Sequence, residues 1–170
     1  MSVKVRGRAW KLGNNISTDH IISGKYKLKS ISSLEGMIPY VFEEVIPGFH
    51  KKVRKGDVIV AGRNFGMGSS REHAPRLLKL VGISAVVAES FARIFFRNAI
   101  NIGLPVITAS VIPGITENGD EIIIDLEEGI IINKSKGVQE QFKPYPREIL
   151  EVINCGGIIE YTKKYGKLPW

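Results

Sequence analysis

Cysteine is almost absent from this chain, since Cys155 is the only one in 170 residues. A single thiol cannot form an internal disulfide, and it cannot by itself hold an iron–sulfur cluster, which takes several thiolates. We therefore expect no metal to be bound by this chain, and any metal centre that it works with must come from elsewhere.

Long apolar runs are also missing. No stretch approaches the roughly 20 apolar residues that span a bilayer, and the N-terminus, MSVKVRGRAW, lacks the apolar core of a signal peptide. We expect a cytoplasmic protein without a membrane partner. Low-complexity tracts are absent too, and 44% of the residues are apolar, so residues 1–170 are expected to form one ordered domain.

The charge is unbalanced but not concentrated. Lys and Arg number 24 against 17 Asp and Glu, which gives a net charge of +7. A positive field suits an anionic partner, either a nucleic acid or a polycarboxylate, although a solvated basic surface has the same composition. The aromatics Phe91, Phe95 and Phe96 are placed as core and lack the exposed stacking pattern of single-strand binders. We therefore expect no nucleic acid, and a non-enzymatic anion- or RNA-binding module remains the alternative.

Apolar runs and glycine-marked turns predict an α/β core in the first two thirds of the chain. Strands are expected at 3–12, 58–61, 83–88 and 104–108, and parallel pairing follows from their alternation with helices. One helix should end at Gly82, and the next should be capped by Ser90 and end at Gly103.

The last third changes character. Three short strands at 122–126, 130–133 and 138–142 are separated by glycine turns, which predicts a β-meander. A helix should begin at Pro146 and end near Gly156, with a last short helix through Tyr161.

The segment 62–75, GRNFGMGSSREHAP, carries the strongest chemical signal. A strand that runs through glycines into a helix gathers unpaired backbone N–H groups and the positive helix end at one point, and that point attracts anions. The simpler alternative is that Ser69 and Glu72 form a capping box. Because Pro75 would remove a bond inside a helix, the regular helix is expected to begin near Ala74.

Other anion and nucleophile motifs fail at this segment. A Walker loop needs Gly-Lys-Ser/Thr, a dinucleotide fingerprint needs glycine where Arg71 stands, and a hydrolase elbow needs glycine two residues past its serine. What remains is a serine hydroxyl beside a guanidinium, which can hold a carboxylate at about 1.5–3 kcal/mol per charge-assisted bond or stabilise a serine alkoxide. A serine hydrolase that pairs Ser69 with His20 or His73 stays open.

Three motifs in order carry a family resemblance: WKLGNNISTDHI at 10–21, GMGSSREHA at 66–74 and AESFARIFFRNAINIGLP at 88–105. Together they closely resemble the swivelling domain of aconitases and the small subunits of isopropylmalate dehydratases and homoaconitases. The resemblance implies an α/β fold, namely a single swivelling β/β/α domain as in the fourth domain of aconitase, with a mixed, largely parallel core and a C-terminal meander. The length agrees with a free-standing small subunit.

The resemblance also implies roles at the matching positions. Ser69 is similar to the general base that removes a proton next to a carboxylate. Ser70 and Arg71 look like groups that bind that carboxylate, and Asp19 like an aspartate that orients the catalytic groups. His20 is expected to have a supporting role; for it and Asp19, a capping or turn pair is the alternative.

Two further parts of the pattern are weaker. His73 is expected to support the loop from within. The basic segment 24–33 reads as a loop and stands where relatives place their specificity loop, so Lys25 and Lys27 are candidate ligands of the substrate and Tyr26 a candidate apolar wall; a merely solvated loop is the alternative. Aconitases use an arginine in this region, and its absence here makes citrate a less expected substrate.

The implied reaction is a dehydration followed by rehydration of a hydroxy di- or tricarboxylic acid, as in leucine biosynthesis. A [4Fe–4S] cluster in a separate large subunit would act as the Lewis acid, so this chain is expected to act only in a heterodimer or heterotetramer. Isopropylmalate, homocitrate or homoaconitate, citramalate and dimethylmalate all remain open as substrates.

Overall fold

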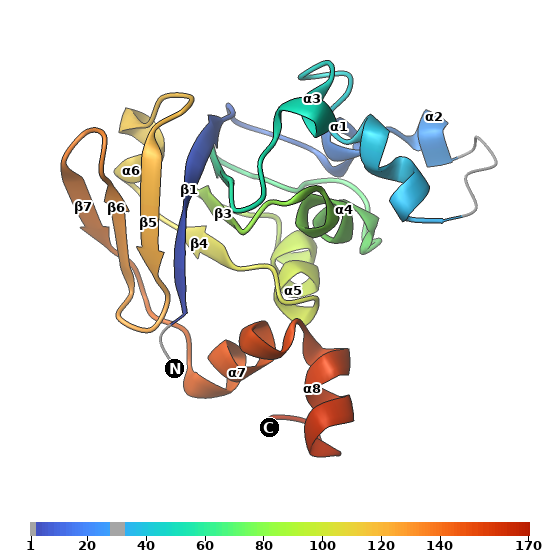
Figure 1. The fold of residues 1–170 in the computed structure, drawn as a ribbon, viewed down its shortest axis with the longest axis vertical. Coiled ribbons are helices and arrows are strands. Elements are labelled where there is room, and N and C mark those ends of the chain that lie inside the picture. The colour runs from blue at the N-terminus through green and yellow to red at the C-terminus, as the bar shows by residue number, and fades with distance from the viewer. Residues whose placement is uncertain (1–2, 28–32) are drawn as a thin grey trace.

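A computed structural model describes residues 3–27 and 33–170. A seven-stranded mixed sheet runs through it in the order β4-β3-β2-β1-β5-β6-β7 (Figure 1). The strands are β1 Lys4–Lys11, β2 Val58–Ala61, β3 Ala85–Ala88, β4 Val106–Thr108, β5 Glu121–Asp125, β6 Ile130–Asn133 and β7 Val138–Gln141. The strand β1 is the junction, because it pairs in parallel with β2 and antiparallel with β5.

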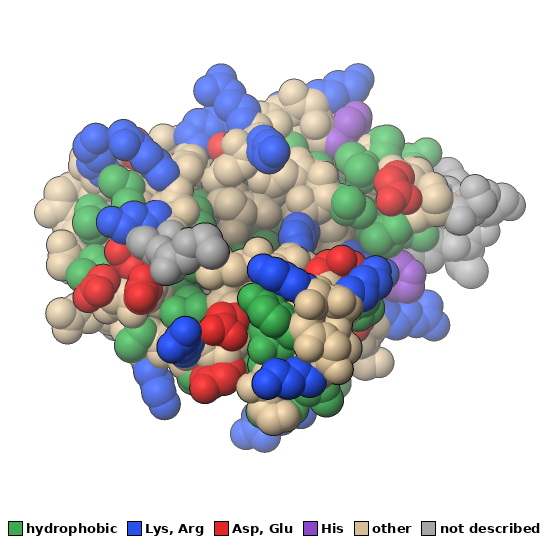
Figure 2. Space-filling model, turned by 60° about the horizontal axis from the view of Figure 1, so that its bottom comes forward, with side chains coloured by type: hydrophobic (Ala, Val, Ile, Leu, Met, Phe, Trp, Pro, Cys, Tyr) green, Lys and Arg blue, Asp and Glu red, His purple; other side chains and the backbone are tan. Residues whose placement is uncertain are grey.

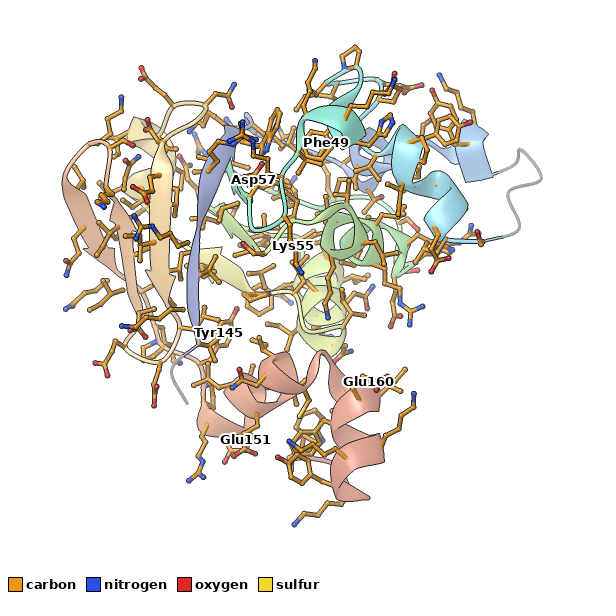
Figure 3. The ribbon with its side chains drawn as sticks, viewed as in Figure 1. Phe49, Lys55, Asp57, Tyr145, Glu151 and Glu160 are labelled. Atoms are coloured by element: carbon orange, nitrogen blue, oxygen red, sulfur yellow. The ribbon has the colours of Figure 1, made fainter. Side chains whose placement is uncertain are left out.

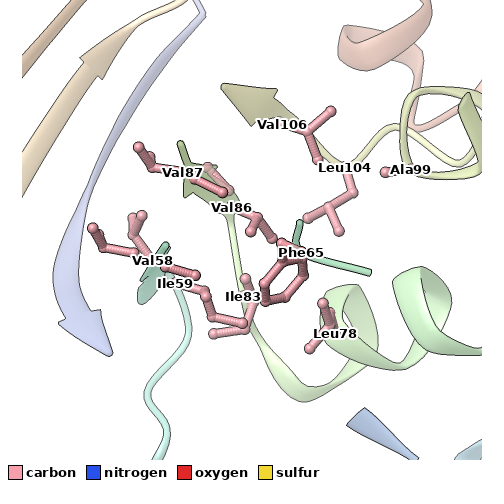
Figure 4. Close-up of a cluster of buried hydrophobic side chains, with 14 of the residues drawn as sticks. Val58, Ile59, Phe65, Leu78, Ile83, Val86, Val87, Ala99, Leu104 and Val106 are labelled. Atoms are coloured by element: carbon pink, nitrogen blue, oxygen red, sulfur yellow. The ribbon is translucent and has the colours of Figure 1, made fainter. Parts of the chain in front are cut away.

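The half of the sheet from β1 to β4 is parallel, as the sequence predicts. Every residue of β2 and β3 is buried, which fits short β-branched runs covered on both faces. Helices α4 (His73–Val81) and α5 (Arg93–Asn101) connect these strands and bury one face each. Figure 4 shows part of the resulting core, in which Phe65 and Leu78 are fully buried.

The strands β5, β6 and β7 form the predicted antiparallel meander. Buried and partly exposed residues alternate along β5 and β6, the pattern of a sheet with one face on the core and the other toward solvent.

Side chains join the two edge strands of the sheet. The Tyr145 hydroxyl donates to the carbonyl oxygen of Val106 on β4 and accepts from the Val106 N–H at 3.2 Å. Glu140 on β7 accepts from the N–H groups of Ser110, Val111 and Ile112 just beyond β4. Tyr145, labelled in Figure 3 where the chain enters the C-terminal helices, thus satisfies main-chain groups that an edge strand leaves open.

Helices α7 (Arg147–Cys155) and α8 (Ile158–Tyr165) form the C-terminal end of the molecule, as the sequence predicts. Figure 2 shows the molecule turned so that this end faces the viewer, and on this face cationic and carboxylate side chains alternate with apolar ones. In the described part of the chain, no helix is long and apolar enough to cross a membrane. The remaining short helices are α1 Thr18–Ile21, α2 Gly24–Lys27, the 3₁₀ helix η1 Glu35–Tyr40, α3 Phe49–Lys52 and α6 Ile112–Ile115.

The structure corrects two local interpretations about helix starts. Ser90 does not cap α5, which begins at Arg93 after Ala92; the Ser90 hydroxyl instead accepts the N–H of Asn64. The capping box at Ser69 does not form, because the residue before α4 is Glu72 and it makes no side-chain cap.

Pro75 lies in the first turn of α4, which begins at His73, next to Ala74, so the helix start predicted near Ala74 is confirmed. A proline there is tolerated because first-turn N–H groups have no partner inside the helix. The segment predicted as a loop is a short helix over Gly24–Lys27, while 28–32 lie outside the described residues.

Candidate active site

The segments that follow β1, β2 and β3 converge at the carboxyl edge of the parallel strands, the place where open α/β sheets bind ligands. The N–H of Arg63 donates to Asn14 Oδ1 at 2.7 Å, which joins the first two segments. The N–H of Phe65 donates to the Ser90 carbonyl oxygen at 3.0 Å, which joins the second and third. Residues distant in sequence therefore meet at one edge.

Glycines let the middle segment approach its neighbours closely. Gly66 has φ +85°, and a Cβ added there would lie 2.2 Å from Cγ of Phe95. Gly68 has φ +114°, and its added Cβ would lie 2.8 Å from Oγ1 of Thr18. Larger residues would therefore meet both a strained backbone and occupied space.

Ser69 is held mainly through its backbone. Its N–H donates to Oγ1 of Thr18 at 2.9 Å, and its own hydroxyl oxygen accepts the N–H of Arg71 at 3.2 Å. Ser69 as a whole residue is partly buried. An N–H donated to this oxygen favours its negatively charged form, so the geometry suits a serine that gives up a proton.

Ser70 and Arg71 stand next to Ser69 with exposed side chains. The Ser70 carbonyl oxygen accepts from Nδ2 of Asn98 on α5 at 2.9 Å, which fixes the loop from its other side. The nine-residue helix α4 begins directly beyond, without a side-chain cap. The hydroxyl, the guanidinium and the positive end of α4 are thus brought to one place, where a carboxylate can be bound.

Asp19 and His20 lie on α1, beside this loop. The N–H of His20 donates to Oγ of Ser17 at 3.1 Å, and Nδ1 of His20 accepts the N–H of Ser17 at 2.9 Å. His20 therefore completes a capping box. Asp19 is exposed and directly follows Thr18, so the structure places it near Ser69.

The predicted supporting and specificity residues lie on neighbouring elements. His73 is the first residue of α4 and is partly buried. Lys25 forms an ion pair with Glu44 and lies 4.9 Å from the ring centroid of Tyr26. Tyr26 stacks on Tyr40 with 4.4 Å between ring centroids.

Lys25 and Tyr26 therefore contact the segment around η1, through Glu44 and Tyr40 respectively. Lys27 ends α2, and its side chain lies outside the described part of the structure. Contact between these residues and a substrate stays a prediction.

A partly open cleft lies elsewhere. A space of about 670 Å³ separates α5, β4 and the segment that enters α7, and its lining includes Phe96, Val106 and Tyr145 but no residue of the Ser69 loop. We place the candidate site at the loop because its hydroxyl, guanidinium and N–H groups can do acid–base chemistry, whereas the cleft is mostly apolar. An open loop of this kind needs a second surface to exclude water.

Comparison with known proteins decides the family. The model of the aconitase C-terminal domain matches residues 15–110, which include both the Thr18–Asp19 segment and the glycine loop. The chain belongs to the aconitase family. This confirms the resemblance carried by the three sequence motifs.

Family members of similar length match almost the whole chain. The small subunit 1 of 3-isopropylmalate dehydratase from Thermotoga maritima is 52% identical over 165 residues, 97% of this chain and 98% of that one. The methanogen homoaconitase small subunit from Methanothermobacter thermautotrophicus is 50% identical over 160 residues, 94% of this chain and 91% of that one. The crystal structure of 3-isopropylmalate dehydratase from Methanocaldococcus jannaschii is 40% identical, covers 96% of each chain and has a TM-score of 0.87. The predicted aconitase-type α/β fold is thereby confirmed.

Sequence reasoning missed two residues that hold the aconitase-type loop in place. Thr18 contacts Ser69 across 51 positions, and Asn98 contacts Ser70 across 28. Both stand inside motifs that carry the resemblance, so motif membership was the available signal. Their contacts are not visible in the sequence, because hydrogen bonds over such separations depend on the folded sheet.

Proposed function

We propose that this chain is the small subunit of a heteromeric hydro-lyase of the 3-isopropylmalate dehydratase type. The reaction is the dehydration and rehydration of a hydroxy di- or tricarboxylic acid. The observation that carries the proposal is the Gly-Ser-Ser-Arg loop, fixed at the carboxyl edge of the parallel strands in a chain about half identical to named small subunits. A homoaconitase small subunit is the alternative within the same class.

In this proposal Ser69 is the general base. It acts as an alkoxide, which the N–H of Arg71 stabilises, and becomes a neutral hydroxyl when it takes the proton from the carbon next to a substrate carboxylate. Ser70 and the Arg71 guanidinium bind the carboxylate. This binding also holds the neighbouring carbon, and the proton on it, in position for Ser69. Asp19, on α1 beside the loop, orients these groups.

The partner is a large subunit that carries the metal chemistry. A cluster does not fit this chain, because Cys155 is its one cysteine and the described residues contain no group of three or more His, Cys, Asp or Glu that could hold a metal. Docking against the large subunit covers the exposed Ser70 and Arg71 and excludes water from the reacting atoms.

The choice of acid depends on the segment around α2. Isopropylmalate presents an apolar branch where homocitrate-type acids present a third carboxylate, so an apolar wall from Tyr26 favours the first and a cation from Lys25 or Lys27 the second. In this structure Lys25 is paired with Glu44. A third carboxylate would have to compete with that pair.

The test is to coexpress the chain with a large subunit encoded beside it, reconstitute the complex without oxygen, and follow formation of the unsaturated acid from a panel of hydroxy acids. Turnover should require both chains. A complex that turns over none of the acids would overturn the proposed function, whereas turnover by the isolated chain would overturn the role of the partner.

The role of Ser69 is tested in the same assay. Ser69→Ala should lower kcat at least about 100-fold, the usual contribution of a general base. Ser135→Ala, in the β6–β7 turn where the Ser135 hydroxyl accepts the Glu121 N–H, is the matched control and should keep the wild-type rate. Unchanged turnover by Ser69→Ala would remove Ser69 from the mechanism.

A further inference from the structure

Thr18 is a buried hydroxyl at the contact between the two proposed catalytic segments. The residue is 2% exposed, and its Oγ1 accepts the N–H of Ser69 at 2.9 Å. Its backbone N–H donates to the Met67 carbonyl oxygen at 2.8 Å, and the Gly66 N–H donates to the Ile16 carbonyl oxygen at 2.7 Å. Three hydrogen bonds therefore fix residues 16–18 against 66–69.

The fit around this hydroxyl is close. A Cβ on Gly68 would stand 2.8 Å from Oγ1 of Thr18, and the Gly68 backbone has φ +114°. The β-branched Thr18 side chain has restricted rotation about χ1. A stiff side chain, packed against a glycine and bonded to the next N–H, leaves Ser69 little freedom to move.

We infer that Thr18 is a positioning residue, which holds Ser69 in place and fixes the position of Ser69 relative to Asp19. The inference rests on the proposed function and extends it to a residue that acts through Ser69 without touching the substrate. Because Asp19 follows Thr18 directly, the same hydrogen bond fixes both groups relative to each other. Misplacement of a reacting group by about 1 Å can cost about 100-fold in rate.

The test compares three variants of the assembled complex. Thr18→Val keeps the shape and removes the acceptor, so kcat should fall about 10- to 100-fold while KM changes less than about threefold. Thr18→Ser restores the acceptor and should recover most of the lost rate. Thr116→Val is the matched control, because Thr116 is 4% exposed and its hydroxyl is also hydrogen-bonded, to the Ile112 carbonyl oxygen; it should keep the wild-type kcat.

Amide hydrogen exchange of the segment around Ser69, measured in the complex by mass spectrometry, is a second readout that does not require turnover. Thr18→Val should raise exchange at the Ser69 amide at least tenfold, and neither Thr18→Ser nor Thr116→Val should. A wild-type kcat together with unchanged exchange in Thr18→Val would overturn the inference. A wild-type complex that is inactive on every acid would overturn the proposed function alone, and the exchange result would then decide the role of Thr18.

Discussion

The parallel and antiparallel halves of the sheet use similar short apolar strands for different purposes. In the parallel half the segments after β1, β2 and β3 cross the same edge, so residues as far apart as Asn14 and Arg63 are hydrogen-bonded there. In the meander each strand pairs with the next along the chain, and the strands are joined by tight turns. Convergence of several distant segments at one edge is what assembles the candidate site, and among the described residues this edge belongs to the parallel half.

Glycines show the same difference. Gly66 lies in a position where its missing side chain leaves room for Phe95, whereas Gly137, in the turn between β6 and β7, has no atom within 4 Å of an added Cβ. Both have positive φ. Close packing therefore distinguishes Gly66, in the candidate site, from Gly137, in a turn of the meander.

The largest expected effect comes from Gly66→Ala. Left-handed backbone costs about 1–2 kcal/mol for a non-glycine residue, and overpacking against Phe95 adds about 1–3 kcal/mol. Urea unfolding should show a loss of about 2–5 kcal/mol, against about 1–2 kcal/mol for the control Gly137→Ala. Equal losses of unfolding free energy in the two variants would show that Gly66 is not packed more closely than Gly137.

The second largest loss of stability is expected from removing the Tyr145 hydroxyl, which joins the two edges of the sheet. Burial raises the pKa of the Tyr145 phenol, which therefore stays neutral and keeps its proton for the Val106 carbonyl oxygen. Tyr145→Phe leaves the N–H and carbonyl groups of Val106 without this partner and should cost about 1–3 kcal/mol in urea unfolding. Tyr165→Phe, at an exposed ring, should cost less than about 0.5 kcal/mol. A loss of similar size at both positions would show that the hydroxyl does not join the edges.

The smallest effect concerns two buried carboxylates, one in each half. Burial by itself would raise the pKa of Asp57, but hydrogen bonds from Arg8, the Arg54 N–H and Trp10 outweigh it and hold the pKa below its usual value. In the meander, the hydrogen bond from Asn133, followed by that from the Glu117 N–H, lowers the pKa of Asp120. Figure 3 labels Asp57 beside β1.

A pKa that is lower in the folded state stabilises the protein above the unfolded value, near pH 4, and this stability is lost as the pH falls through the folded value. The urea midpoint should therefore decrease from pH 6 to pH 3. Asp57→Asn should flatten this decrease more than Asp120→Asn does, because the Asp57 side chain is 4% exposed and that of Asp120 11%. The opposite ranking would show that the meander, not the β1–β2 junction, controls the acid response.

Local sequence signals predicted the regular elements well and the caps poorly. The strands, the helices α4, α5, α7 and α8, and the glycine ends of the first three of these helices were predicted because apolar period and glycine positions are properties of short segments. Ser90 was wrongly taken as a helix cap, since its hydroxyl is used by Asn64, 26 residues away. The capping alternative for His20 is confirmed, whereas its partner Ser17 was not predicted, because the residue at the third position is a histidine and not a glutamate.

For this protein the sequence by itself determined the alternation of strands and helices, the change to a meander, the Gly-Ser-Ser-Arg loop and, through three motifs, the family. Only the tertiary structure decided which groups hold that loop, that Lys25 pairs with Glu44, and that Tyr145 joins the sheet edges. The reason is physical. Propensity and periodicity act between neighbours in the chain, whereas a hydrogen bond between residues such as Thr18 and Ser69 exists only after the strands have paired in register and brought both to one edge.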